Sequence, residues 1–384
     1  MKHLKNINLL LLSALLTTAC SNEETPEPTI NPANDPEAVE LGITAGVALT
    51  KSAISGWSTN DQIAIFATGD DYTSAKKNDH AIYTYNTNWS NSGNDKIYLT
   101  HKTATIYGYY PSSLTKPSST TDPVVAINVF EGGDDDDNAK YPALASLDNA
   151  DKVWSTSWVT NADASKLITA PGEVDYMWAE DANNASSQAT ASNGKEDSNV
   201  DESVSLNMKH ALSMVSFRIY NDGTYTGSSK LTKIVLKNSS TTVLSKGNNP
   251  TMSLKNGAIT ENTSTAATYT RTFTDTDGYA IPTKGENKAT TEDNAKEAAK
   301  KFSIMVLPDG NSKFDKTKVQ VEFTIDGATY PIALADPTES GDEGKWIAGK
   351  NYLYTVKLSG KELTITSVSV AQWTSATGSD LNVK

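Results

Sequence analysis

The stretch KVQVEFTIDGATYPIAL (residues 318–334) decides the fold class. In its first half, apolar residues alternate with polar ones, the apolar set being Val319, Val321, Phe323 and Ile325. This period of two is typical of a strand with one buried and one solvated face. Asp326-Gly327 then supplies a preferred two-residue turn between strands. The stretch therefore predicts an antiparallel hairpin in a sheet that packs on a core.

Similar short runs of β-branched and aromatic residues recur from Leu41 onward, separated by clusters of Gly, Asn, Asp, Ser and Thr. Examples are DQIAIFA (61–67), HAIYTYN (80–86) and FSIMVLPDG (302–310). Helical signal is scarce; TTEDNAKEAAKK (290–301) predicts one short helix with a threonine cap and early acids. The sequence therefore predicts an all-β protein built from sandwiches.

The length of 384 residues suits two domains. A polar, strand-poor segment at 179–203 separates two strand-rich halves. We place the boundary near residue 205, which predicts an N-terminal β-sandwich domain at 38–205 and a C-terminal one at 206–384.

The charge balance excludes some functions. With 33 Lys and Arg against 46 Asp and Glu, the formal net charge is −13. Binding to nucleic acid or anionic membrane needs clustered cations, so these partners are not expected. A single cysteine, Cys20, excludes disulfides within the chain and thiolate metal sites. No zinc-hydrolase, nucleophile-elbow or phosphate-loop motif occurs, and His210 lies in an amphipathic strand, so we expect no enzyme, cofactor or metal.

The N-terminus reads as a secretion signal at residues 1–20, because its apolar run (7–16) is too short to span a membrane. Small residues before Cys20 resemble a bacterial lipobox, which implies acylation of Cys20 (palmitate); ordinary cleavage is the alternative. Residues 21–37 are rich in Pro and Glu and are expected to form a disordered tether.

Two further clusters allow more than one interpretation. The four acids Asp134–Asp137 form either a solvated loop or a calcium site. A group of aromatics belongs either to the core or to a sugar-binding platform; its members are Trp154, Trp158, Tyr176 and Trp178.

Five segments in order resemble the fimbrillin family of Bacteroidetes, the subunits of type V pili. They are SGWSTNDQIAIF (55–66), ATIYGYYPSS (104–113), VDYMWA (174–179), MKHALSMVSFRI (208–219) and GKNYLYTVKLSGKELTITSVSVAQW (349–373). The resemblance implies two transthyretin-like β-sandwich domains in tandem. It also implies a structural and adhesive pilus subunit, without enzymatic activity, whose lipid-anchored precursor lies at the cell outer membrane and which is found in the fimbrium at the cell surface.

The resemblance further implies assembly by strand exchange with other copies or sibling pilins. A protease cuts after the first strand (about 38–50), and the C-terminal segment of another subunit fills the vacancy. Lys51 lies where the family has an arginine or lysine, so cleavage there would leave Ser52 as the new N-terminus; a plain surface lysine is the alternative. Lost strands expose apolar side chains and unpaired backbone, which a neighbour's strand can satisfy.

The donor candidate is residues 361–384, with the final strand of the second domain as the alternative. Leu363 and Ile365 are out of phase with Val368 and Val370, which predicts a bulge near Ser367. A different class of function also stays open, namely a cell-surface glycan-binding lipoprotein that does not polymerise.

Overall fold

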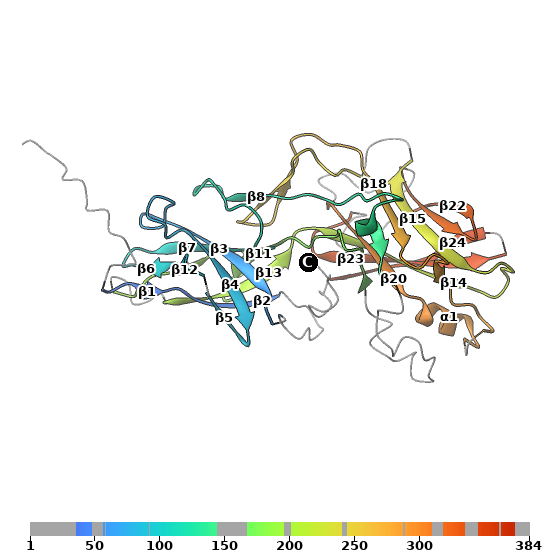
Figure 1. Cartoon of the computed structure of the whole chain (residues 1–384), viewed down its shortest axis with the longest axis horizontal. Coiled ribbons are helices and arrows are strands. Elements are labelled where there is room, and N and C mark those ends of the chain that lie inside the picture. Colours follow the sequence, from blue (N-terminus) through green and yellow to red (C-terminus); the bar gives the residue numbers. More distant parts are fainter. Residues whose placement is uncertain are drawn as a thin grey trace, which may run out of the picture.

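The computed structural model describes residues 36–47, 57, 59–91, 93–143, 167–195, 201–239, 244–286, 289–308, 318–334, 345–360 and 362–372. Strands dominate these residues, and the helices among them are short: α1 (Glu292–Ala298) and the 3-10 helix η2 (Asp137–Ala139). The strands gather in two lobes along the long axis of the molecule (Figure 1). The predicted all-β, sandwich-type fold is therefore confirmed.

One eight-stranded sheet builds the first lobe, in the order β2-β13-β11-β7-β3-β4-β5, and β12 pairs with β7. A small pair, β1-β6, lies outside it. The strands are β1 (Val39–Glu40), β2 (Gly42–Val47), β3 (Gln62–Thr68), β4 (His80–Asn86), β5 (Asn88–Ser90), β6 (Tyr98–Leu99), β7 (Ala104–Tyr110), β11 (Met177–Asp181), β12 (Ala189–Ala191) and β13 (Ser203–His210).

Central strand β3 shows why the sequence forms this sheet. Its residues Ile63 and Ile65 pack into the core of the first lobe, whereas Ala64 and Phe66 pack into a second core on the opposite face. Alternating side chains of one strand point to opposite faces. An apolar run is therefore favourable here, because both faces of β3 are covered.

The second lobe is a sandwich of a five-stranded sheet, β10-β20-β14-β23-β24, and a six-stranded sheet that runs β22-β21-β15-β18-β9 with β19 beside β15. Phe217 and Phe323, from opposite sheets, meet edge to face at 5.5 Å. The strands are β9 (Lys140–Tyr141), β10 (Leu167–Ile168), β14 (Ser213–Asn221), β15 (Lys230–Asn238), β18 (Thr268–Phe273), β19 (Tyr279–Ala280), β20 (Lys301–Val306), β21 (Val319–Ile325), β22 (Ala328–Ala333), β23 (Lys350–Ser359) and β24 (Glu362–Gln372).

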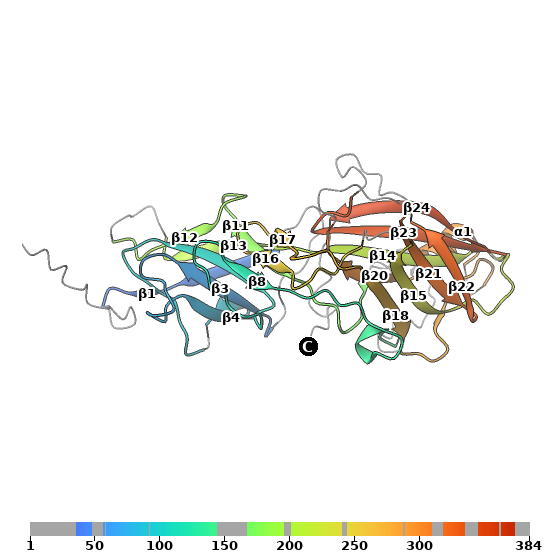
Figure 2. The ribbon, with the colours of Figure 1, turned by 90° about the horizontal axis from the view of Figure 1, so that it is seen from above.

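Three short strands of the first half of the chain pair with strands of the second half. β8 (Val124–Ala126) joins β16 (Thr251–Ser253) and β17 (Ile259–Thr260) in a three-stranded sheet, seen near the middle of the molecule in Figure 2. β9 pairs with β18, and β10 pairs with β20. The chain therefore crosses into the second lobe after β7 and returns to the first lobe at β11.

Local predictions can be compared with these elements. The hairpin at Asp326-Gly327 is confirmed, since both residues have positive φ, 50° and 79°, between β21 and β22. The short helix is confirmed as α1, with Thr291 as its N-cap. The proposed boundary at 205 falls inside β13, and β14 begins the second lobe at Ser213.

Candidate functional site

Strand β2 is the edge of the first lobe and the centre of the candidate site. Among the described strands it pairs with β13 only, in parallel, from Gly42 opposite Ser203 to Val47 opposite Met208. Leu41 and Ile43 are buried, with 2% and 6% exposure, in the core of the first lobe. The predicted first strand is thus confirmed for residues 42–47, and it covers apolar surface.

The outer edge of β2 is capped by side chains. The hydroxyl of Tyr83 donates to the carbonyl of Leu41 at 2.8 Å, and burial, followed by the nearby Glu40 carboxylate, raises the pKa of Tyr83. The indole Nε1 groups of Trp57 and Trp89 both donate to the carbonyl of Ala45, at 2.9 and 3.2 Å. Because Trp89 lies on β5, these bonds join the two ends of the eight-stranded sheet.

A half-buried aromatic cluster surrounds this contact. The rings of Trp57 and Trp89 meet edge to face at 5.0 Å, and Tyr110 and Tyr85 pack on them at 6.1 and 5.4 Å respectively. Burial raises the pKa of Tyr110 to about 12, helped by Asp175 and Asp61. Trp57 belongs to a segment singled out in the sequence. Trp89 and Tyr83 were not singled out as site residues, because nothing in their neighbouring sequence indicates that they bind the backbone of β2.

The processing residues lie outside the described part of the chain. This applies to Cys20, Lys51 and Ser52. Along the chain, the last described residue before Lys51 is Val47, at the end of β2, and the first described residue after it is Trp57. The expected roles of all three stay predictions.

The donor candidate lies partly within the second lobe. Strand β24 pairs with β23 from Glu362 to Gln372 and is the last strand of its sheet. The pairing shifts register between Ile365 and Ser367, which makes Thr366 the extra residue and confirms the predicted bulge near Ser367. Leu363 and Val370 are buried, and Ile365 and Val368 pack against the same core. Residues 373–384 lie outside the described part.

The acidic run has separate partners for its carboxylates. Asp134 binds Lys233 at 2.9 Å, and Asp137 binds Lys140 at 2.6 Å. Asp136 caps η2 by accepting from the backbone of Asn138. Among the described residues, no group of three or more His, Cys, Asp or Glu could hold a metal ion.

The remaining sequence candidates that the structure describes are buried. Tyr176 and Trp178 are buried in the core, so the sugar-platform interpretation is wrong for these two residues. Trp154 and Trp158 lie outside the described residues. His210 is buried and its Nδ1 lies 2.9 Å from the carboxylate of buried Asp175, at the end of β13.

The comparisons with known proteins agree on one group. The model of the fimbrillin-like family matches residues 50–373. The chain belongs to the fimbrillin-like family. Two similar solved structures are proposed cell adhesion proteins from Bacteroides uniformis and Bacteroides ovatus. They are 18% and 15% identical, with TM-scores of 0.52 and 0.53; each match covers 88% of this chain and 100% or 98% of the other. No curated protein sequence matches.

Identities this low show a shared fold, while the family match shows the class of function. Membership of the fimbrillin-like family supports a pilus-subunit or adhesion role and a cell-surface location for this protein, and it places the protein in a non-enzymatic class. No helix among its described residues is long and apolar enough to cross a membrane.

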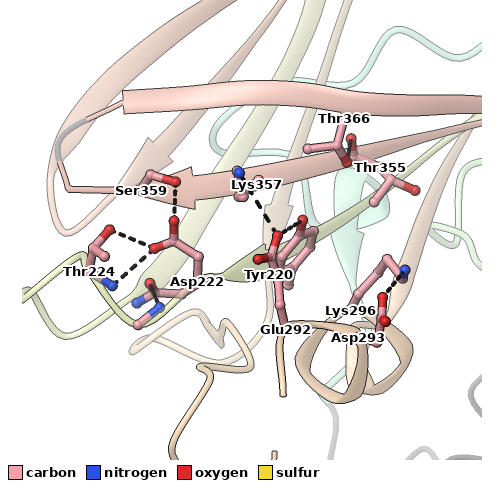
Figure 3. Close-up of polar contacts among 12 residues, drawn as sticks. Tyr220, Asp222, Thr224, Glu292, Asp293, Lys296, Thr355, Lys357, Ser359 and Thr366 are labelled. Atoms are coloured by element: carbon pink, nitrogen blue, oxygen red, sulfur yellow. Dashed lines mark hydrogen bonds and ion pairs between the residues drawn. The ribbon is translucent and has the colours of Figure 1, made fainter.

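The polar cluster beside α1 in this fimbrillin-like protein also has a structural role (Figure 3). Tyr220 donates to Glu292 at 2.7 Å, and burial followed by this bond raises the pKa of Tyr220 to about 12. Burial opposes ionisation of Asp222, but hydrogen bonds from Ser359 and Thr224 outweigh it and hold the pKa of Asp222 below its ordinary value. These contacts fix the helix and a loop to the outer face of the five-stranded sheet.

Proposed function

We propose that this protein is a pilus subunit assembled by proteolytic removal of its first strand and donor-strand exchange. Its precursor is anchored at the cell outer membrane through acylated Cys20. A protease cuts after Lys51, and the mature chain begins at Ser52. An extended strand from another copy or a sibling pilin then replaces β2, with residues 361–384 as the donor candidate.

The observation that carries this proposal is the position of β2. Among the described residues β2 pairs with β13 only, Ile43 on β2 and Leu41 just before it are buried, and Lys51 follows four residues after the end of β2. Removing it uncovers apolar surface and the backbone edge of β13. Exposure of either to water is unfavourable. An added strand would cover the apolar surface and pair with the backbone of β13. A subunit without β2 therefore has a strong tendency to bind an extended segment.

The donor end is consistent with this scheme. β24 is an end strand of the five-stranded sheet, and residues 373–384 follow it in the sequence. The glycan-binding alternative loses Tyr176 and Trp178 as platform residues, since both are buried.

The proposal is tested with full-length Lys51→Gln expressed in a fimbriated host. We expect wild-type fibres to contain chains that begin at Ser52, by N-terminal sequencing, and the variant to remain monomeric and lipid-anchored. Lys51→Arg should restore processing. Lys77→Gln, at an exposed turn lysine, is the matched control and should assemble normally. Fibres of Lys51→Gln that retain Cys20 would overturn the proposal.

A further inference from the structure

A row of polar side chains crosses the outer face of the five-stranded sheet in the second lobe. Because Phe217 points into the core, its neighbour Arg218 points to the opposite, outer face. The strand register places Thr355 of β23 beside Arg218, and Ser367 of β24 beside Thr355. On the other side, Lys301 at the start of β20 lies beside Arg218. Adjacent strands lie about 4.8 Å apart, so the row is about 14 Å long.

The two cations of this row share one carboxylate. The Nε of Arg218 donates to the hydroxyl of Thr355 at 2.9 Å, and its Nη1 lies 3.5 Å from a carboxylate oxygen of Glu297 on α1. Thr355 and the neighbouring helix α1 are seen in Figure 3. Within the part of the chain that the structure describes, the ammonium of Lys301 has no ion pair or hydrogen-bond partner. Like charges on neighbouring strands repel, so this arrangement is unfavourable without a further anion.

Partial burial strengthens this imbalance of charge. Lys301 is half-buried, and burial, followed by the nearby Arg218, lowers the pKa of its ammonium. The side chain of Arg218 is 16% exposed, whereas that of Glu297 is 43% exposed and is therefore better screened by water. The next cation along this face, Lys357, already has Glu292 at 3.9 Å. Two cations against one carboxylate leave a local excess of positive charge, in a chain whose formal net charge is −13.

Arginine is rare in this chain, and its two arginines differ in their contacts. Arg271 is fully buried and its donors bind Glu173 and backbone carbonyls. Arg218 reaches the surface, and its side-chain contacts with described residues use Nε and Nη1 only. A guanidinium has five N–H donors, so the two at Nη2 remain for a ligand. Together with the three N–H donors of the Lys301 ammonium, they suit the two oxygens of a carboxylate.

The far end of the row offers hydroxyl groups. Ser367 is exposed there, and Ser369, two residues further along β24, is also exposed and has the same facing. A sugar that carries a carboxylate fits both ends, because its carboxylate matches the cations and its hydroxyls match the serines. A polyanion fits poorly, since Glu297 and the net negative charge of the chain repel further anionic groups.

We propose that Arg218 and Lys301 bind the carboxylate of an acidic sugar, a uronic or a sialic acid, on the outer face of the five-stranded sheet. The Lys301 ammonium and the Nη2 of Arg218 donate to the carboxylate oxygens, and charge-assisted hydrogen bonds of this kind are stronger than neutral ones. Ser367 and Ser369 bind hydroxyls of the same saccharide. The site gives the adhesion role a class of ligand, and it lies on the second lobe, so it does not depend on the removal of β2.

The ligand class is tested with the purified full-length chain and saturation-transfer NMR titrations. The probes are the methyl glycosides of glucuronic acid and of N-acetylneuraminic acid, with methyl glucoside as the neutral match and acetate as the bare anion. We expect at least one acidic sugar to bind roughly fivefold or more tightly than methyl glucoside and acetate. Equal binding of methyl glucoside would show that the cations play no part. Equal binding of acetate would show an anion site that does not recognise sugar.

Protein variants test the two cations directly. Arg218→Gln and Lys301→Gln should each weaken binding of the acidic sugar roughly fivefold or more, and Lys301→Arg should keep it. Glu297→Gln should strengthen binding about twofold or more, because it removes the carboxylate that competes for Arg218. Lys237→Gln is the matched control, at a half-buried lysine on the other sheet that pairs with Glu322 at 2.9 Å, and it should bind normally.

Lys301→Gln also separates binding from folding. It removes the contact between like charges and breaks no bond to a described residue, so its thermal midpoint should be no lower than that of the wild type. An acidic sugar that binds Lys301→Gln as tightly as it binds the wild type would overturn the site. Fibres should form normally from Lys301→Gln, so a failure of this proposal and a failure of the proposed function are seen in different measurements.

Discussion

At the scale of single residues, the buried Arg271 holds together several segments through its guanidinium. It is fully buried on β18 and its Nε donates to Glu173 at 2.7 Å. Its other donors bind the carbonyls of Phe130, Glu131 and Thr270 at 2.9, 2.6 and 2.9 Å. The ring of Phe130 lies 4.9 Å from the guanidinium carbon. One side chain of the second lobe therefore binds residues 130, 131 and 173, which belong to the part of the chain that crosses between the lobes.

Replacing Arg271 with Met should lower the free energy of unfolding by about 3–5 kcal/mol, because the carboxylate of Glu173 is left buried without its cation. Urea unfolding followed by circular dichroism measures this loss. Asp293→Asn breaks the exposed pair with Lys296 and should leave the unfolding midpoint unchanged. A change below about 1 kcal/mol for Arg271→Met would show that the anchor is not needed.

At the scale of elements, the β21–β22 hairpin is held by its turn carboxylate. Asp326 accepts hydrogen bonds from the hydroxyl of Tyr225 at 2.8 Å and from the backbone of Ser229 and Lys230 at 3.0 and 2.9 Å. Burial opposes its ionisation, but these bonds outweigh burial and hold the pKa of Asp326 below its ordinary value. The ionised carboxylate therefore stabilises the folded state.

Asp326→Asn keeps a residue suited to this turn, removes the charge and replaces one of the two accepting oxygens with an NH2 donor. A lowered folded-state pKa gives stability that is present above the unfolded pKa and lost as pH falls through the folded pKa. We expect the variant to be about 1 kcal/mol less stable at pH 7, allowing for solvent exposure, and the gap to narrow as pH falls through the folded-state pKa of Asp326. Urea midpoints across pH measure this, with Asp277→Asn as the control for net charge. A gap that is constant with pH would contradict the assignment.

The sequence predicted elements whose pattern is local. The alternation in β21, the turn at Asp326-Gly327 and the capped helix α1 all depend on neighbours in the chain. The two indole bonds to the carbonyl of Ala45 could not be predicted, because Trp57 and Trp89 reach Ala45 only when the two ends of the first sheet meet. A single sequence does not show which carbonyl will accept the hydrogen bond of an indole N–H.

At the scale of the whole molecule, the two lobes are interlocked. The strands β8, β9 and β10 come from the first half of the chain and complete sheets of the second half. These strands are two or three residues long and show no hydrophobic periodicity that would reveal their partners. The predicted boundary therefore assigned them to the first domain by their position in the chain alone. The proposed boundary at 205 likewise divides β13. Tandem domains with these limits stay a prediction.

Interlocking predicts that the second half cannot fold alone. A fragment of residues 211–384 lacks β8, β9, β10 and Glu173, which leaves Arg271 buried without its partner. We expect it to be insoluble or to unfold without cooperativity, and co-expression with residues 36–210 to restore a soluble complex. Size-exclusion chromatography and thermal unfolding measure this. A fragment that unfolds cooperatively by itself would show that the crossing strands are dispensable.

The parallel alignment of β2 with β13 has a consequence for anything built from many copies. If a strand of another subunit replaced β2, as proposed above, it would have to run parallel to β13 to keep this pairing. A subunit that accepts such a strand from one neighbour and donates its own to another forms a heterologous junction, and repeating that junction generates a ring or an open filament. An open filament of this kind has two chemically different ends.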